Sequence, residues 1–204
     1  MSEASRAAPD IWERPNLPPG ASKEEKKIDI AKIKIKHAYS AHLYYKPDRI
    51  YFHTDVSPEL WERAKSSGNI WTKRVLNIPG VTPHYVEHPR MTSLGQDLDT
   101  FGVKSDIVRG YALRSFGGIY LDTDAIPLRD IAPLRNAGFA NIVGGQGAIR
   151  TRWMGYINTG VWLSRPHSNL VEIYNMAMDK YYKGQWALSV DILTDLAYRL
   201  HAML

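Results

Sequence analysis

Two aspartates, Asp122 and Asp124, are the residues whose type and spacing best suit chemistry in this sequence. They follow the run Gly-Gly-Ile-Tyr-Leu at 117–121, in which the glycine pair allows a tight turn and the next three residues predict a short strand. In an extended chain, alternate side chains point to the same side, so the two carboxylates would lie about 6.6 Å apart along one face. The sequence therefore predicts a carboxylate pair at a strand end, where α/β sheets bind ligands.

Two neighbouring carboxylates repel each other unless a cation lies between them or one is protonated. Carboxylate oxygens suit the hard ions Mg²⁺ and Mn²⁺, and two protein ligands leave most of an octahedral shell open for water or a diphosphate. The pattern predicts Mn²⁺ or Mg²⁺ at Asp122 and Asp124, where the metal would hold a nucleoside-diphosphate leaving group. The alternative is a surface turn with two solvated aspartates, because the bare tripeptide Asp-x-Asp is common.

Asp106 and Arg109 lie three positions apart at the start of a predicted helix that Ser105 would cap. In one interpretation, Asp106 stabilises the positive helix end and forms an ordinary ion pair with Arg109. In the other, Asp106 accepts hydrogen bonds from sugar hydroxyls and Arg109 contacts a sugar or phosphate. Both interpretations remain open at this level.

Strand and helix signals alternate along the chain. Runs rich in β-branched and aromatic residues predict strands at 49–54, 81–87, 119–121, 141–143 and 158–163. Helical spacing of apolar residues, with capping residues such as Ser57 and a stop at Gly117, predicts helices at 37–45, 57–67, 105–116, 168–182 and 186–201. This alternation predicts an α/β layered fold.

Three segments carry weaker signals. Residues 28–36 alternate isoleucine with polar residues and predict an extended, bulged segment at a sheet edge. A nucleic-acid arm is disfavoured there, because no aromatic residues are interleaved with the lysines. His84 and His88 lie among prolines and are interpreted as loop residues. Residues 1–22 are rich in proline and predict a flexible N-terminal tail before a domain at 23–204.

Composition limits the possible classes of protein. The 204 residues are 44% hydrophobic and 23% charged, which is the balance of a globular domain. The chain has no cysteine, which excludes disulfides, thiolate metal sites and a cysteine nucleophile. The net charge of +5 mildly favours anionic partners. No membrane-spanning run or export signal is visible, and the helical pattern continues almost to Leu204, so we expect the domain to be incomplete at its termini.

The segment 105–128 resembles the Ser-Asp-x-x-Arg … Gly-Gly-x-Tyr-x-Asp-x-Asp block of DXD-containing glycosyltransferases. These enzymes are similar to the initiating mannosyltransferase of fungal outer chains and, more distantly, to the clostridial glucosylating toxins. Weaker resemblance covers Lys46–Asp55, Tyr156–Trp162 and Trp186–Val190. One departure from the family pattern is the lysine-rich segment 28–36, where the family has an apolar first strand. A second is at the C-terminus, where we expect that the later part of the family domain is not included.

The resemblance implies a GT-A-type fold and a retaining transferase that moves a sugar from a nucleoside-diphosphate donor to a glycan, lipid or protein acceptor. It also suggests the Golgi or another endomembrane compartment. By position, it implies metal ligands at Asp122 and Asp124, and a donor site formed by Asp106, Arg109, Tyr120 and Asn158. It identifies no nucleophile. The alternatives are a degenerate, non-catalytic homologue and, less favoured, a metal-dependent phosphohydrolase with Asp122 as nucleophile.

Overall fold

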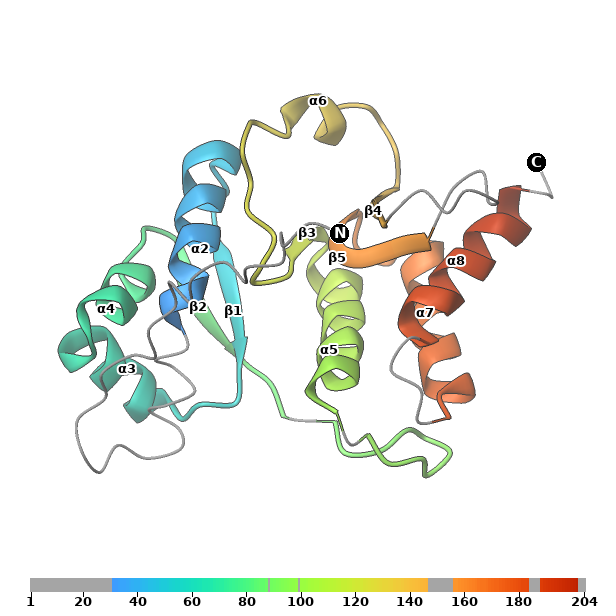
Figure 1. Cartoon of the computed structure of the whole chain (residues 1–204), viewed down its shortest axis with the longest axis horizontal. Coiled ribbons are helices and arrows are strands. Elements are labelled where there is room, and N and C mark those ends of the chain that lie inside the picture. The colour runs from blue at the N-terminus through green and yellow to red at the C-terminus, as the bar shows by residue number, and fades with distance from the viewer. Residues whose placement is uncertain (1–30, 88, 99, 147–155, 184–187, 202–204) are drawn as a thin grey trace, which may run out of the picture. The chain divides into compact units, whose positions relative to one another are not determined.

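The computed structural model describes residues 31–87, 89–98, 100–146, 156–183 and 188–201. The expected tail at 1–22 lies outside these residues. Helices and strands alternate, which confirms the predicted α/β class (Figure 1). The chain divides into two compact units: unit 1 runs up to Tyr85 and includes Ile126–Leu128, and unit 2 contains Val86–Ala125 and Arg129–Leu204. Each unit has its own sheet and its own hydrophobic core.

Unit 1 is built on two parallel strands, β1 (Ile50–Thr54) and β2 (Val81–Tyr85). Helices α3 (Pro58–Ser67) and α4 (Ile70–Leu76) connect them, and α2 (Ala31–Tyr45) packs against α4. The buried core of this unit consists of Ala38, Val56, Trp61, Val75, Leu76 and Ile78. Ser57 caps α3 as predicted, with its side chain accepting a hydrogen bond from the backbone N–H of Leu60 at 3.3 Å.

The prediction of an extended segment at 28–36 is wrong for its described part, because residues 31–36 belong to the single helix α2. Lysine and alanine are good helix formers, and the helix predicted for 37–45 simply extends toward the N-terminus. Its end is marked by Lys46, whose φ of 45° is left-handed, just before Pro47. Helix α4 was not predicted, although the side chain of Asn69 caps it by accepting from the N–H groups of Trp71 and Thr72.

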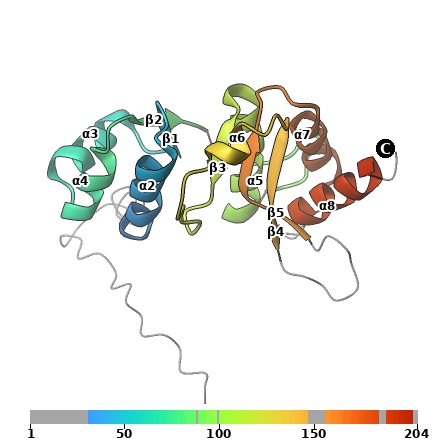
Figure 2. The ribbon, with the colours of Figure 1, turned by 90° about the horizontal axis from the view of Figure 1, so that it is seen from above.

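Unit 2 contains a three-stranded antiparallel sheet in the order β3-β5-β4. Its strands are β3 (Gly118–Leu121), β4 (Asn141–Gln146) and β5 (Tyr156–Ser164). Helix α5 (Phe101–Phe116) lies below the sheet in Figure 1, and helices α7 (Asn169–Tyr181) and α8 (Leu188–His201) lie to the right of α5. Figure 2 shows the same elements from above. Trp162 of β5 packs edge-on against Tyr174 of α7, with ring centroids 5.2 Å apart, at the centre of the core.

The start of α5 differs from the prediction. The helix begins at Phe101, and the side chain of Thr100 caps it by accepting from the N–H of Val103 at 3.4 Å. Ser105 therefore lies within the helix, and no acidic residue occupies the first turn. The interpretation of Asp106 as a residue that stabilises the helix end is wrong, because the dipole effect is confined to the terminal turn.

Gly117 ends α5 as predicted. Its φ of 62° is left-handed, and its N–H donates to the carbonyl of Leu113 at 2.9 Å. A Cβ at this position would lie 2.6 Å from the backbone nitrogen of Pro166, so only glycine fits the turn. The chain therefore passes directly from α5 into β3.

The remaining elements of unit 2 lie where the sequence predicts them, with small changes of bounds. Ser168 caps α7, and α8 covers the described part of the helix predicted at 186–201. The four-residue helix α6 (Ala132–Arg135) was not predicted. Of the described helices, none has the length and apolar character needed to span a bilayer.

His84 is not a loop residue, because it lies in β2 directly opposite His53 of β1. The two Nδ1 atoms are 2.9 Å apart, and the rings are nearly perpendicular. Burial, and then the charge of His84, lower the pKa of His53 from 6.5 to about 4. His88 lies outside the described residues.

We expect unit 1 to lose stability as the pH falls from about 6.5 to about 4, because the unfolded chain takes up a proton at His53 that the folded chain excludes. The free energy of unfolding should fall by about 1–3 kcal/mol at most, and the full contribution of His53 should be present above pH 6.5. Urea unfolding at a series of pH values measures it. His53→Asn should flatten the dependence of the free energy of unfolding on pH. His167→Asn changes an exposed histidine and should leave that dependence unchanged. The same pH dependence in the His53→Asn variant and the parent would contradict the assignment.

Candidate functional site

The guanidinium of Arg109, on α5, links two carboxylates. Its Nη1 lies 2.9 Å from Oδ1 of Asp106, and its Nη2 lies 2.8 Å from Oδ1 of Asp122. Arg109 is 3% exposed and Asp106 is 9% exposed. The predicted i,i+3 ion pair between Asp106 and Arg109 is confirmed, but it is buried, and Arg109 also pairs with Asp122, directly after β3. The Nη1 group also donates to the hydroxyl of Thr159 in β5.

Tyr120, in β3, completes this cluster. Its ring centroid lies 4.5 Å from the guanidinium carbon of Arg109, which is a cation–π distance. Its hydroxyl donates to Oδ1 of Asp122 at 3.0 Å and lies 3.3 Å from Oγ of Ser105. Tyr120 and Asp122 therefore share one side of the chain, as strand geometry predicts.

The guanidinium of Arg109 and the hydroxyl of Tyr120 both have raised pKa values and keep their protons. Burial raises the pKa of Tyr120, against the opposing effect of the Arg109 charge. Burial alone would lower the pKa of Arg109, but Tyr120, Asp106 and Asp122 together outweigh it and raise that pKa. Arg109 is thus a permanent cation beneath the carboxylates.

The expected extended geometry of the two aspartates is not observed. Strand β3 ends at Leu121, and the N–H of Ala125 donates to the carbonyl of Asp122 at 3.0 Å, which closes a tight turn. Asp124 lies in this turn and is exposed, while Asp122 is partly buried. The pairing of β3 with β5 extends to Asp122, whose N–H donates to the carbonyl of Gly160 at 2.7 Å, and the turn follows directly.

Strand β5 carries a bulge at the site. Val143 of β4 lies opposite Trp162, but the next residue, Gly144, lies opposite Asn158, so 159–161 have no partner in β4. Bulges redirect side chains and occur beside functional sites. Here the bulge places Thr159 against Arg109, and the side chain of Asn158 accepts from the N–H of Gly160 at 2.6 Å.

Gly160 allows Asp122 and Asn158 to approach each other. A Cβ at Gly160 would lie 2.8 Å from Oδ2 of Asp122 and 2.7 Å from Oδ1 of Asn158. Hydrogen bonds and ion pairs therefore connect Asp106, Arg109 and Tyr120 with Asp122, while Asn158 and Asp122 each approach Gly160. Thr159 and Gly160 were not among the predicted site residues, although a glycine inside a predicted strand is a signal for a bulge.

The donor atoms of the site fit a hard divalent cation. The hydrogen bonds from Arg109 and Tyr120 to Asp122 both end on Oδ1, and the second oxygen, Oδ2, lies over the Gly160 backbone. The single positive charge of Arg109 balances only one of the two negative charges on Asp106 and Asp122, and Asp124 adds a further negative charge. No group of three or more acidic or histidine side chains that could hold a metal occurs within the described part of the chain. Two carboxylate ligands would leave the other positions of an octahedral shell open for water or a diphosphate.

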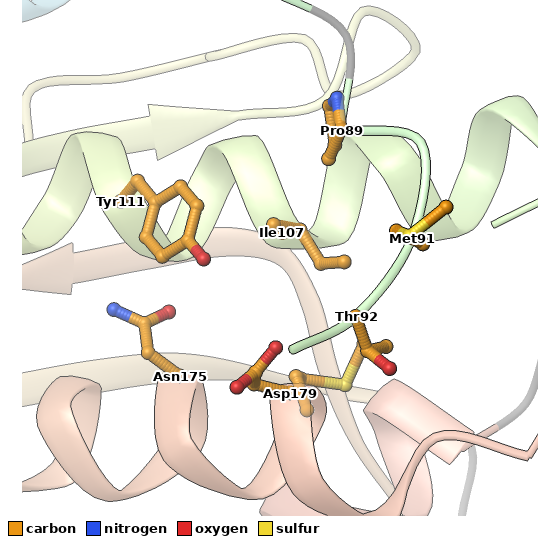
Figure 3. Close-up of a pocket in the computed structure, with 8 residues that line it drawn as sticks. Pro89, Met91, Thr92, Ile107, Tyr111, Asn175 and Asp179 are labelled. Atoms are coloured by element: carbon orange, nitrogen blue, oxygen red, sulfur yellow. The ribbon is translucent and has the colours of Figure 1, made fainter. Parts of the chain in front are cut away.

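A separate small pocket in unit 2 lies between α5, α7 and the segment 89–92 (Figure 3). Ile107 and Tyr111 line it from a face of α5 other than the one that carries Asp106 and Arg109. Its edges are held by hydrogen bonds from Asn175 to the carbonyl of Gly110 at 3.1 Å and from the N–H of Ser93 to Asp179 at 2.7 Å. None of the residues expected at the donor site lines this pocket.

A buried arginine–carboxylate cluster lies beside an exposed aspartate at a strand end of an α/β protein, and this arrangement makes it the candidate for a polar ligand-binding site. Residues 34–141, more than half of the chain, match the family model described as "glycosyltransferase sugar-binding region containing DXD motif". The chain belongs to this glycosyltransferase family. The match includes Asp106, Arg109, Tyr120, Asp122 and Asp124 and ends before Asn158. A comparison with curated proteins found no match.

Proposed function

We propose that this protein is a retaining, metal-dependent glycosyltransferase of the hexosyltransferase type that uses a nucleoside-diphosphate sugar. The observation that carries the proposal is the Asp122-Thr123-Asp124 turn, which lies within the family region and is held by Arg109 and Tyr120. A GT-A-type fold is the architecture that we expect for this domain.

Asp122, through Oδ2, and Asp124 would hold Mn²⁺ or Mg²⁺. Such a cation, when bound, stabilises the negative charge that develops on the departing diphosphate. Arg109 keeps Oδ1 of Asp122 occupied and so presents Oδ2 to the ligand. The hydroxyl of Tyr120 also donates to Oδ1 of Asp122, so Arg109 and Tyr120 hold this carboxylate in place before a ligand binds.

The sugar of the donor would lie against Asp106 and Asn158, whose oxygens accept hydrogen bonds from its hydroxyl groups. Arg109 is almost fully buried, so its role in this proposal is to orient the two aspartates rather than to cover the sugar itself. The sequence-based role of Arg109 as a sugar or phosphate contact is therefore revised to an indirect one.

A donor-hydrolysis assay with a panel of nucleotide sugars and Mn²⁺ tests the function. Release of free sugar with retained anomeric configuration is the expected result. Release of phosphate from simple phosphoesters would instead support a phosphohydrolase. No turnover of any donor, together with no nucleotide binding in calorimetry, would support a non-catalytic homologue and contradict the proposal.

Asp106→Asn should weaken binding of the intact nucleotide sugar at least tenfold and binding of the free nucleotide much less, because Asp106 faces the sugar in this proposal. The change should also lower the free energy of unfolding by about 1–3 kcal/mol, since it removes the charge from a buried hydrogen bond to Arg109. Calorimetric titration with both ligands measures the difference. Equal weakening of the two ligands would contradict a sugar contact.

A further inference from the structure

The bulge in β5 contributes two residues that the proposed function does not yet use. We propose that Thr159 and Gly160 are positioning residues that fix the Asp122 carboxylate and the Arg109 guanidinium in the orientation that the cation and donor require. This inference rests on the proposed function. Neither residue needs to touch the donor, because each acts through a neighbouring side chain.

Thr159 acts on Arg109. Its hydroxyl accepts from Nη1 of Arg109, the same nitrogen that pairs with Asp106. Thr159 is 3% exposed, so water cannot easily replace this acceptor. The hydroxyl, the two carboxylates and the Tyr120 ring all contact the guanidinium and so restrict its orientation. Loss of the hydroxyl would leave a buried donor unsatisfied and allow the guanidinium to turn.

Gly160 acts on Asp122. The carbonyl of Gly160 accepts from the N–H of Asp122, so the two backbones are held together at 2.7 Å. Within this contact, a Cβ would lie 2.8 Å from Oδ2 of Asp122 and 2.7 Å from Oδ1 of Asn158, which is closer than real Cβ contacts. The carboxylate cannot swing away without breaking the bonds of Oδ1 to Arg109 and Tyr120.

The bulge is what makes these two contacts compatible. Residues 159–161 have no partner in β4, while Val161 still pairs with Leu121 of β3. The strand can therefore turn the Thr159 hydroxyl toward α5 and keep its ladder with β3. A regular strand would place successive side chains on alternate faces in register with both neighbours.

Titration of Mn²⁺ alone, by calorimetry and by electron paramagnetic resonance, tests the role of Gly160. Gly160→Ala should weaken Mn²⁺ at least tenfold. Gly145→Ala is the matched control, because Gly145 lies in β4 of the same sheet and a Cβ there meets nothing within 4 Å. Unchanged Mn²⁺ affinity in a folded Gly160→Ala protein would overturn the positioning role alone. No Mn²⁺ binding by the unaltered protein would overturn the proposed metal site and this inference together.

Thr159 offers a second test that does not add volume to the core. Thr159→Val keeps the shape and removes the hydroxyl, and Thr159→Ser keeps the hydroxyl. We expect valine to weaken a nucleotide sugar with Mn²⁺ at least tenfold and serine to restore binding to within about threefold, with melting curves showing folded protein in both cases. Equal binding by the valine and serine variants would show that the hydroxyl does not position Arg109.

Discussion

Replacing Asp124 by alanine should abolish metal-dependent binding of nucleoside diphosphates and leave the fold nearly unchanged. Asp124 is exposed in the turn after β3, so its side chain contributes little to packing. In the proposed site it supplies one of only two protein ligands, and a hard cation with a single carboxylate ligand is held weakly. Calorimetric titration of a nucleoside diphosphate with Mn²⁺ and with a chelator measures both states.

The matched control is Asp195→Ala, which removes an exposed aspartate from α8 of the same unit. It should leave nucleotide binding unchanged. Asp130 is a poorer control than its position suggests, because its carboxylate accepts from the N–H of Ala132 at the start of α6. Metal-independent binding of undiminished affinity in the Asp124→Ala protein would refute the metal assignment.

Arg109→Ala should cost about 3–5 kcal/mol in the free energy of unfolding, the largest stability effect that we expect of a single substitution here. The change removes the cation between Asp106 and Asp122 and leaves two carboxylates without their charge partner. Repulsion and poor solvation would then act together. Urea unfolding monitored by tryptophan fluorescence measures the cost. The signal includes Trp162, which is fully buried in the core of unit 2, together with Trp61 in the core of unit 1.

Arg114→Ala is the comparison for Arg109. It removes an arginine from the same helix, where an exposed ion pair joins Arg114 to Glu172 at 2.9 Å. Exposed pairs contribute about 0–1 kcal/mol, so this variant should unfold almost as the parent does. Arg109→Lys should remain well below the parent in stability, because one ammonium cannot reproduce the forked contacts to two carboxylates. Similar costs for the Arg109→Ala and Arg114→Ala variants would contradict the buried network.

Elements with a chemical start or stop signal were predicted well from the sequence. Ser57 with Pro58, Ser168 and Gly117 each mark a helix end through a hydrogen bond or a backbone angle that depends on that residue type. The start of α5 was misplaced because Ser105 is also a residue type that caps helices. In the structure the cap is Thr100, whose side-chain hydroxyl accepts from the N–H of Val103. Residues 31–36 were misjudged because alternating isoleucine and lysine suits both a strand and a helix.

The candidate site was predicted as a set of residues but not as a structure. The family pattern contains Asp106, Arg109, Tyr120 and Asp122, and the structure joins them. The family pattern does not reveal the turn after Asp122, which places Asp124 outside the strand. A single backbone hydrogen bond closes this turn, and no residue type in the pattern signals it. The bulge in β5 also escaped prediction, since it is a mismatch between strands that only their pairing reveals.

The direct passage from α5 into β3 has a consequence for insertions and deletions. Arg109 and Tyr120 meet across the Gly117 turn, whose backbone packs against Pro166. One residue added to the helix between Arg109 and Gly117 would rotate Arg109 by about 100° about the helix axis relative to the strand. One residue added within β3 would move Tyr120 or Asp122 to the opposite face of the sheet. The chain length between Arg109 and Asp122 is therefore as much a part of the site as the side chains.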